Sequence, residues 1–141
     1  MKKTYLKIFE LLAEIDEIRY IDLDAGQLKL EKPPVAYPFV LVKIDENTVQ
    51  DVEHTFQIIQ ANISLTVGDK YLSETNNLTT AEIREKGLKY LELCEKIYQK
   101  LQGYAGDGFE SFTFRSGSDS QIRNGIKTVV QRWETSYQKE N

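Results

Sequence analysis

The sequence predicts an α+β fold: a mostly antiparallel sheet of about five strands, a long helix packed across it, and a short N-terminal helix. Three observations lead to this fold class. Residues 79–103 repeat apolar side chains at helical spacing, residues 56–67 alternate with a period of two, and the segments around the long helix are strand-like. With 141 residues, 40% of them hydrophobic, the chain suits one domain spanning residues 1–141, since two domains would each be marginal.

The first element is a short amphipathic helix within residues 3–18. Tyr5, Ile8, Phe9, Leu12 and Ile15 fall on one side of it. The basic start at residues 1–3 is followed by Glu10 and Glu14 rather than by an uninterrupted apolar run. We therefore expect neither a signal peptide nor a membrane span, and a soluble intracellular protein when it is first made.

Two strands and a loop come next. Residues 18–23 form a possible strand, and the Pro33-Pro34 pair makes residues 27–36 an extended loop. Residues 37–44 are almost continuously apolar, which predicts a strand covered on both faces. Residues 45–53 are polar and acidic, and we expect a connecting loop there.

The clearest strand is residues 56–67. Its alternation predicts one buried face, formed by Ile59, Ala61, Ile63, Leu65 and Val67, and one polar face. Residues 68–78 are then expected to form a polar loop that leads into the long helix.

The long helix is predicted over residues 79–103. Thr79 and Glu82 have the spacing of a capping box, and Gly103 stands where a left-handed C-terminal cap is expected. Gly87 falls in the middle and costs about 1 kcal/mol relative to Ala, so we expect it to allow a close approach. The apolar stripe comprises Ile83, Gly87, Tyr90, Leu91, Cys94, Ile97, Tyr98 and Leu101.

Two strands close the chain. Residues 109–115 alternate and predict a strand, and residues 116–120 have the composition of a mobile loop tip. The last strand is predicted over residues 126–137. One of its faces carries Lys127, Val129, Gln131, Trp133, Thr135 and Tyr137.

The composition argues against several classes of function. A net charge of −4 does not suit a protein that holds nucleic acid by neutralising phosphates, and we expect no sequence-specific nucleic-acid binding. Cys94 is the only cysteine and His54 the only histidine, so we expect a buried, inert thiol and no metal site. No catalytic residue or cofactor site emerges, because the acidic residues of 45–53 fit a solvated hairpin better than a catalytic carboxylate pair.

Taken together, the elements resemble the tail terminator, or tail completion, family of long-tailed phages and prophages. The resemblance rests on the short N-terminal helix, the run from Pro33 to Val42, the alternating strand 57–67, the helix 79–103 and the closing Trp133–Tyr137 segment. It covers nearly the whole chain through the order of its elements.

This resemblance implies a non-enzymatic structural protein of the virion without a cofactor. It implies a homo-oligomeric ring, a hexamer, that caps the head-proximal end of the tail tube, ends tube polymerisation and provides the surface for joining the head. The implied partners are other copies of the chain, the tail tube protein and a head-completion or connector protein. The implied location is the virion tail after assembly and the host cytoplasm at synthesis, with no membrane partner.

Two sets of residues are candidates for this role. Aromatic side chains beside charges suit subunit contacts, so Arg132, Trp133, Glu134 and Tyr137 are predicted to lie between copies, with an ordinary core position for Trp133 as the alternative. Four acidic residues are predicted to line the lumen of the ring and repel DNA, with a merely solvated loop as the alternative. They are Asp45, Glu46, Asp51 and Glu53.

Two other functions remain open from the sequence. One is a head–tail connector or another tail-associated protein. The other is a bacterial α+β domain that binds a small ligand or a peptide on its sheet face or at residues 116–120.

Overall fold

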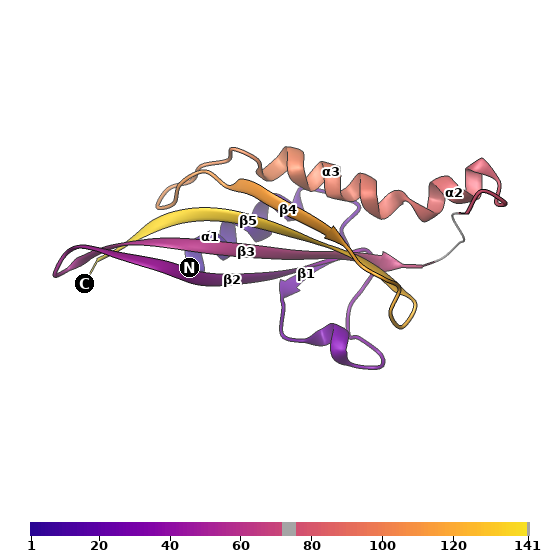
Figure 1. The fold of residues 1–141 in the computed structure, drawn as a ribbon, viewed down its shortest axis with the longest axis horizontal. Coiled ribbons are helices and arrows are strands. Elements are labelled where there is room, and N and C mark those ends of the chain that lie inside the picture. The colour runs from indigo at the N-terminus through magenta and orange to yellow at the C-terminus, as the bar shows by residue number, and fades with distance from the viewer. Residues whose placement is uncertain (72–75, 141) are drawn as a thin grey trace.

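A computed structural model describes residues 1–71 and 76–140 and confirms the predicted α+β fold (Figure 1). The strands pair in the order β1-β2-β3-β5-β4; β1 is parallel to β2 and the other three pairings are antiparallel. The elements are α1 (Lys2–Ala13), β1 (Tyr20–Leu23), the 3-10 helix η1 (Gln27–Lys29), β2 (Phe39–Glu53), β3 (Phe56–Lys70), α2 (Ala81–Gly87), α3 (Lys89–Leu101), β4 (Thr113–Asp119) and β5 (Ile126–Glu140).

The main core lies between one face of the sheet and the two helices α1 and α3. The predicted alternation of β3 is confirmed, because the five residues from Ile59 to Val67 that share its apolar face are at most 1% exposed. Ile8 and Leu12 of α1 and Ile97 of α3 complete this core. Each such large side chain contributes about 1.5–3 kcal/mol through burial.

Within residues 1–71 and 76–140, the opposite face of the sheet is covered only at one end. There the segment after η1 brings Val35 and Tyr37 onto Phe39 and Leu41. All four residues from Phe39 to Val42 are fully buried, as predicted for a strand covered on both faces. Gly68 faces the Phe39 ring, where a Cβ would lie 2.4 Å from the nearest ring carbon, so only glycine fits that position.

The long helix is interrupted, contrary to the prediction of one helix over 79–103. Leu88 has φ −103° and ψ 3° and separates α2 from α3, directly after Gly87 (Figure 1). The N-cap is Thr80, whose hydroxyl accepts a 3.3 Å hydrogen bond from the Ile83 N–H, rather than Thr79. The poor helix propensity of Gly87 explains the break. The left-handed Gly103, with φ +78°, follows α3 as predicted.

Two predicted loops are strands in the structure. Residues 45–53 continue β2, and residues 116–119 continue β4. Apart from Glu46, their side chains are exposed on both faces, so no apolar alternation marked them, yet backbone pairing with β3 and β5 holds them extended. The turn between β4 and β5 instead centres on Asn124 and Gly125, which both have positive φ. Within the predicted 68–78 loop, β3 extends to Lys70 and residues 72–75 lie outside the described residues.

Candidate assembly surfaces

Trp133 and Tyr137, predicted to lie between copies, are core residues of the subunit, which is the alternative position considered for Trp133. Trp133 is 1% exposed and Tyr137 is 6% exposed. The Trp133 ring lies edge-on to Phe114 with centroids 5.2 Å apart, and its indole N–H donates to Gln131 at 3.2 Å. The alternation of β5 directs both side chains toward the helices, and Trp133 is enclosed there by the subunit itself.

Arg132 and Glu134 point to the opposite, helix-free face of the sheet, and both are exposed. Glu134 accepts a 2.8 Å hydrogen bond from Arg115 Nε, which forms an exposed ion pair. These residues border a shallow depression of about 340 Å³ whose other side chains are mainly polar. Asp45, Asn62, Ser64 and Ser116 are among them.

The four acidic residues predicted for a lumen loop lie on strand β2 and do not form one cluster. Asp45 is on the helix-free face, 3.8 Å from Lys43. Glu46 turns to the helix side and accepts hydrogen bonds from Lys139 Nζ at 2.6 Å and from the Tyr137 hydroxyl at 2.8 Å. The hydrogen bond from Lys139 is the main cause that lowers the Glu46 pKa, and Tyr137 adds to it against the effect of burial.

The remaining two acidic residues, Asp51 and Glu53, are exposed near the end of the β2–β3 hairpin. Asp51 accepts a 2.7 Å hydrogen bond from the Gln57 side chain. This hairpin and the last residues of β5 form a three-stranded end of the sheet, whose outermost part extends beyond the helices (Figure 1). We call it the β arm and define it as residues 44–53, 56–63 and 135–140.

A groove lies beside the β arm, between the outer edge of β5, the start of α1 and the loop before β4. Its volume is about 820 Å³. We call it the N-terminal groove. It is lined by residues 1–4, by Gly106, Gly108, Phe109 and Glu110, and by Ile58, Ser136, Tyr137, Gln138 and Glu140.

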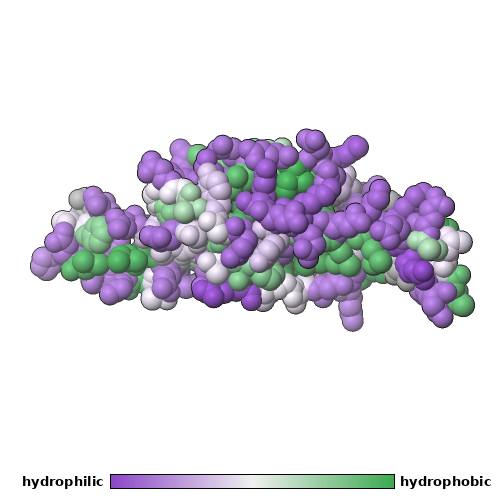
Figure 2. Space-filling view, turned by 90° about the horizontal axis from the view of Figure 1, so that it is seen from above, coloured by the Kyte–Doolittle hydropathy of each residue, from purple (hydrophilic) through white to green (hydrophobic). Residues whose placement is uncertain are grey.

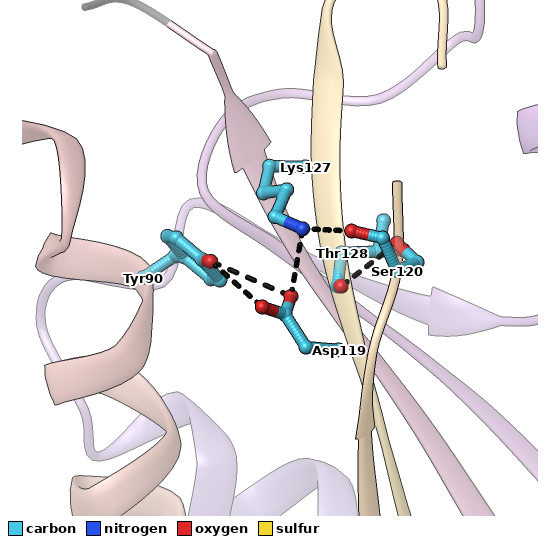
Figure 3. A network of polar contacts seen from close by, with 5 residues as sticks. All are labelled: Tyr90, Asp119, Ser120, Lys127 and Thr128. Atoms are coloured by element: carbon cyan, nitrogen blue, oxygen red, sulfur yellow. Dashed lines mark hydrogen bonds and ion pairs between the residues drawn. The ribbon is translucent and has the colours of Figure 1, made fainter. Parts of the chain in front are cut away.

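A polar network ties α3 to the β4–β5 hairpin at the other end of the sheet (Figure 3). The Tyr90 hydroxyl lies 3.4 Å from both carboxylate oxygens of Asp119, and Lys127 Nζ is 3.0 Å from the same carboxylate. Lys127 also donates to the Ser120 carbonyl, and Ser120 bonds Thr128. Burial, together with the Asp119 charge, raises the Tyr90 pKa to about 12. Because every polar group here has a protein partner, the network serves to hold the helix on the hairpin.

Cys94 and His54 were considered from the sequence as possible chemical groups, and they lie in different parts of the structure. Cys94 is half-buried rather than fully buried, and burial with the nearby Asp119 and Glu95 charges raises its thiol pKa to about 11. His54 is exposed in the turn between β2 and β3. In the part of the chain that the structure describes, no three His, Cys, Asp or Glu side chains come together as a metal-holding group.

The helices of the described residues are all too short or too polar to cross a membrane.

The sequence did not predict the β arm or the N-terminal groove. One local signal was available for the neighbouring hairpin: Asn124-Gly125 is a hairpin turn signal that indicates where β5 begins, and hence that the strand before it ends near residue 120. No comparable local signal indicates which edges of the sheet stay unpaired, because that depends on the strand order.

Comparison with known proteins gives a structural match. No family model and no curated protein matches the sequence. Among solved structures, the fold is similar to a chain from the virion of a native gene transfer agent particle, with a TM-score of 0.55 and 11% sequence identity. The match covers 93% of this chain and 91% of that one. The two chains therefore share a fold over almost their full lengths.

Proposed function

We propose that this protein is a structural component of a phage or prophage virion and that it acts as the tail terminator. In this role, copies form a ring, a hexamer, on the head-proximal end of the tail tube. The ring ends tube polymerisation and offers the head-completion protein a docking surface. The observation that carries the proposal is the fold shared over 93% of the chain with a virion particle component.

The architecture supports a role in assembly rather than in catalysis. A ring needs a heterologous contact, in which one surface of a copy meets a different surface of the next. Both sides of the β arm leave backbone groups exposed, and strand edges of this kind associate by adding a further strand. The helix-free face, with its shallow polar depression, provides a flat surface rather than a deep cleft.

Two of the residues first considered for subunit contacts still suit them. Arg132 and Glu134 are exposed on the helix-free face, and such charges belong to the polar rim of an interface. Asp45 lies on the same face and is our candidate for a lumen residue, where its charge would repel DNA. An Asp45→Lys variant that assembles normally and also passes the genome normally would contradict the lumen role.

The phenotype of a phage lacking this gene tests the proposal. Without a terminator, tube protein continues to add, so we expect overlong tubes without heads in electron micrographs. Loss of a head–tail connector would instead leave tails of normal length that are detached from heads. Normal, infectious particles would contradict any virion role. Purified protein, alone at high concentration or with tube protein, is expected to form assemblies of several copies by mass photometry, and a strict monomer would contradict the ring.

A further inference from the structure

The β arm is open at both of its long edges. On the β2 side, the last backbone hydrogen bond from a neighbouring segment runs from the Asp24 N–H to the Val42 carbonyl. On the β5 side, the last one runs from the Glu110 N–H to the Ser136 carbonyl. The backbone groups of every second residue in a strand point to the same edge. Gln138 and Glu140 therefore present their backbone groups to the same outer edge as Ser136. Beyond these points, no backbone partner on either edge occurs among the described residues.

Such edges attract further strands. The unpaired stretch of β2 covers residues 44–53, and two bulges, at Asn47 and Val52, interrupt its ladder with β3. Val49 and Val52 are more than half exposed on this strand. Figure 2 shows the apolar residues at the end of the molecule where the β2–β3 hairpin lies. An exposed strand with apolar side chains and open backbone groups is a template for pairing with another chain.

The N-terminal groove supplies a matching surface on the other side of the arm. It runs along the open edge of β5, and its wall carries Lys2 and Lys3, together with Glu110 and Glu140. Neither lysine forms an ion pair within the described residues. Phe109 and Tyr137 also line the groove, although each is less than 10% exposed. The opposite, β2 side of the arm carries the exposed acids Asp51 and Glu53.

We propose that the occupant of this groove is the β arm of a second copy of this chain, a step that rests on the self-assembly proposed above. The open edge of β2 in one copy pairs with the open edge of β5 in the next, and Asp51, whose ladder partner Gln57 shares the helix-side face with Ile59, lies against Lys2 and Lys3. The pairing is parallel, because β2 and β5 are both antiparallel to β3. Residues 136–140 give the contact a length of about 16 Å.

This contact is heterologous and directional. The two edges lie on opposite sides of the same end of the molecule, flanking β3. Copies placed side by side therefore keep all their arms at one level and extend one sheet from subunit to subunit. Repeated by a constant rotation that divides a full turn evenly, such a contact closes into a ring.

Reciprocal charge reversal tests the contact. One variant combines Lys2→Glu with Lys3→Glu and alters only the groove; the other combines Asp51→Lys with Glu53→Lys and alters only the arm. Each variant alone places like charges in every contact, so we expect the concentration for half-assembly to rise at least about tenfold. In an equimolar mixture, each arm meets a groove of opposite charge if the two variants alternate. Assembly of the mixture, with an even number of copies, is the expected result in mass photometry.

A matched control makes the same change of charge at a different site. Lys29→Glu with Lys32→Glu alters two exposed lysines in the segment at η1, outside the groove, and is expected to assemble like the wild type. Circular dichroism and thermal unfolding of every variant report whether the subunit is intact. If the wild type forms rings and both reversed variants assemble equally well, or if the mixture fails to assemble while both variants are folded, this contact is wrong and the ring uses other surfaces. A wild type that stays monomeric even with tube protein contradicts the ring itself.

Discussion

The hydroxyl of Tyr137 donates a 2.8 Å hydrogen bond to the carboxylate of Glu46, a residue 91 positions earlier in the chain. The bond crosses from β5 over β3 to β2 on the helix side of the sheet, at the base of the β arm. Lys139 joins the same carboxylate at 2.6 Å. The three side chains thus fix the outer strands of the arm to each other where the helical layer ends.

Tyr137→Phe should lower the free energy of unfolding by about 1–2 kcal/mol, because it removes a hydrogen bond to a charged acceptor in a partly exposed place. Urea unfolding at pH 7 measures the loss. Tyr71→Phe, which alters an exposed tyrosine, is the matched control and should change the unfolding free energy by less than about 0.5 kcal/mol. Equal effects of the two variants would contradict this account of the arm.

Glu46 also makes stability depend on acid pH. Its pKa is lowered in the folded chain, mainly by Lys139, so its contribution is present above the unfolded pKa of 4.5 and is lost as pH falls through the folded pKa. The Glu46→Gln variant should therefore lose less stability than the wild type as the pH falls below about 4.5. Parallel stability curves of the wild type and the variant through the acid range would show that the linkage is absent.

Trp133→Ala should destabilise the subunit by about 3–5 kcal/mol, because it empties a large buried volume between α3 and the sheet. Arg132→Ala, one residue away on the other face, should change stability by about 0.5 kcal/mol or less. Thermal and urea unfolding of both variants check this contrast. A stable Trp133→Ala monomer that only fails to assemble would restore Trp133 as a contact residue.

Tyr90 should link stability to alkaline pH. Its pKa is raised to about 12 from the ordinary 10.0, so its contribution is complete below pH 10 and disappears as pH rises through 12. The stability advantage of the wild type over Tyr90→Phe should therefore shrink between pH 9 and pH 11.5 in urea unfolding. Tyr98→Phe, which alters an exposed tyrosine of the same helix, serves as the control. A constant gap between the wild type and Tyr90→Phe would contradict the network's role.

Cys94 should react slowly. A thiol pKa of about 11, against the ordinary 9.0, lowers the thiolate fraction at pH 8 by about 100-fold, and half-burial slows access further. A thiol-specific disulfide reagent should modify the native protein far more slowly than the urea-unfolded protein at equal pH. Equal rates would show that the thiol is accessible and unperturbed.

Local sequence patterns predicted the elements that have one buried and one exposed face. The period of two in β3 placed Ile59 and Ile63 correctly on the buried face, and the same alternation in β5 grouped Trp133 with Tyr137. The second half of β2 was missed, because its side chains other than Glu46 are exposed on both faces and only pairing with β3 keeps it extended. The break at Leu88 was missed because the apolar spacing continues through it.

The positions of the residues predicted for assembly could not be derived from the local sequence pattern alone. A tryptophan between charged neighbours looks the same in a core and at an interface, and only the position of α3 over β5 assigns Trp133 to the core. The four acids of residues 45–53 looked like one loop, whereas the pleat of β2 sends Asp45 and Glu46 to opposite faces.

The sequence by itself determined the α+β class, the order of most elements and the buried face of the central strands. The reason is that burial of one face produces a regular repeat of apolar residues, which is visible in the local sequence. The tertiary structure alone decided which strands lie at the edges, which of those edges stay open and which charges stand beside them. Those properties arise from contacts between segments as distant as Glu46 and Tyr137, and no local period encodes them.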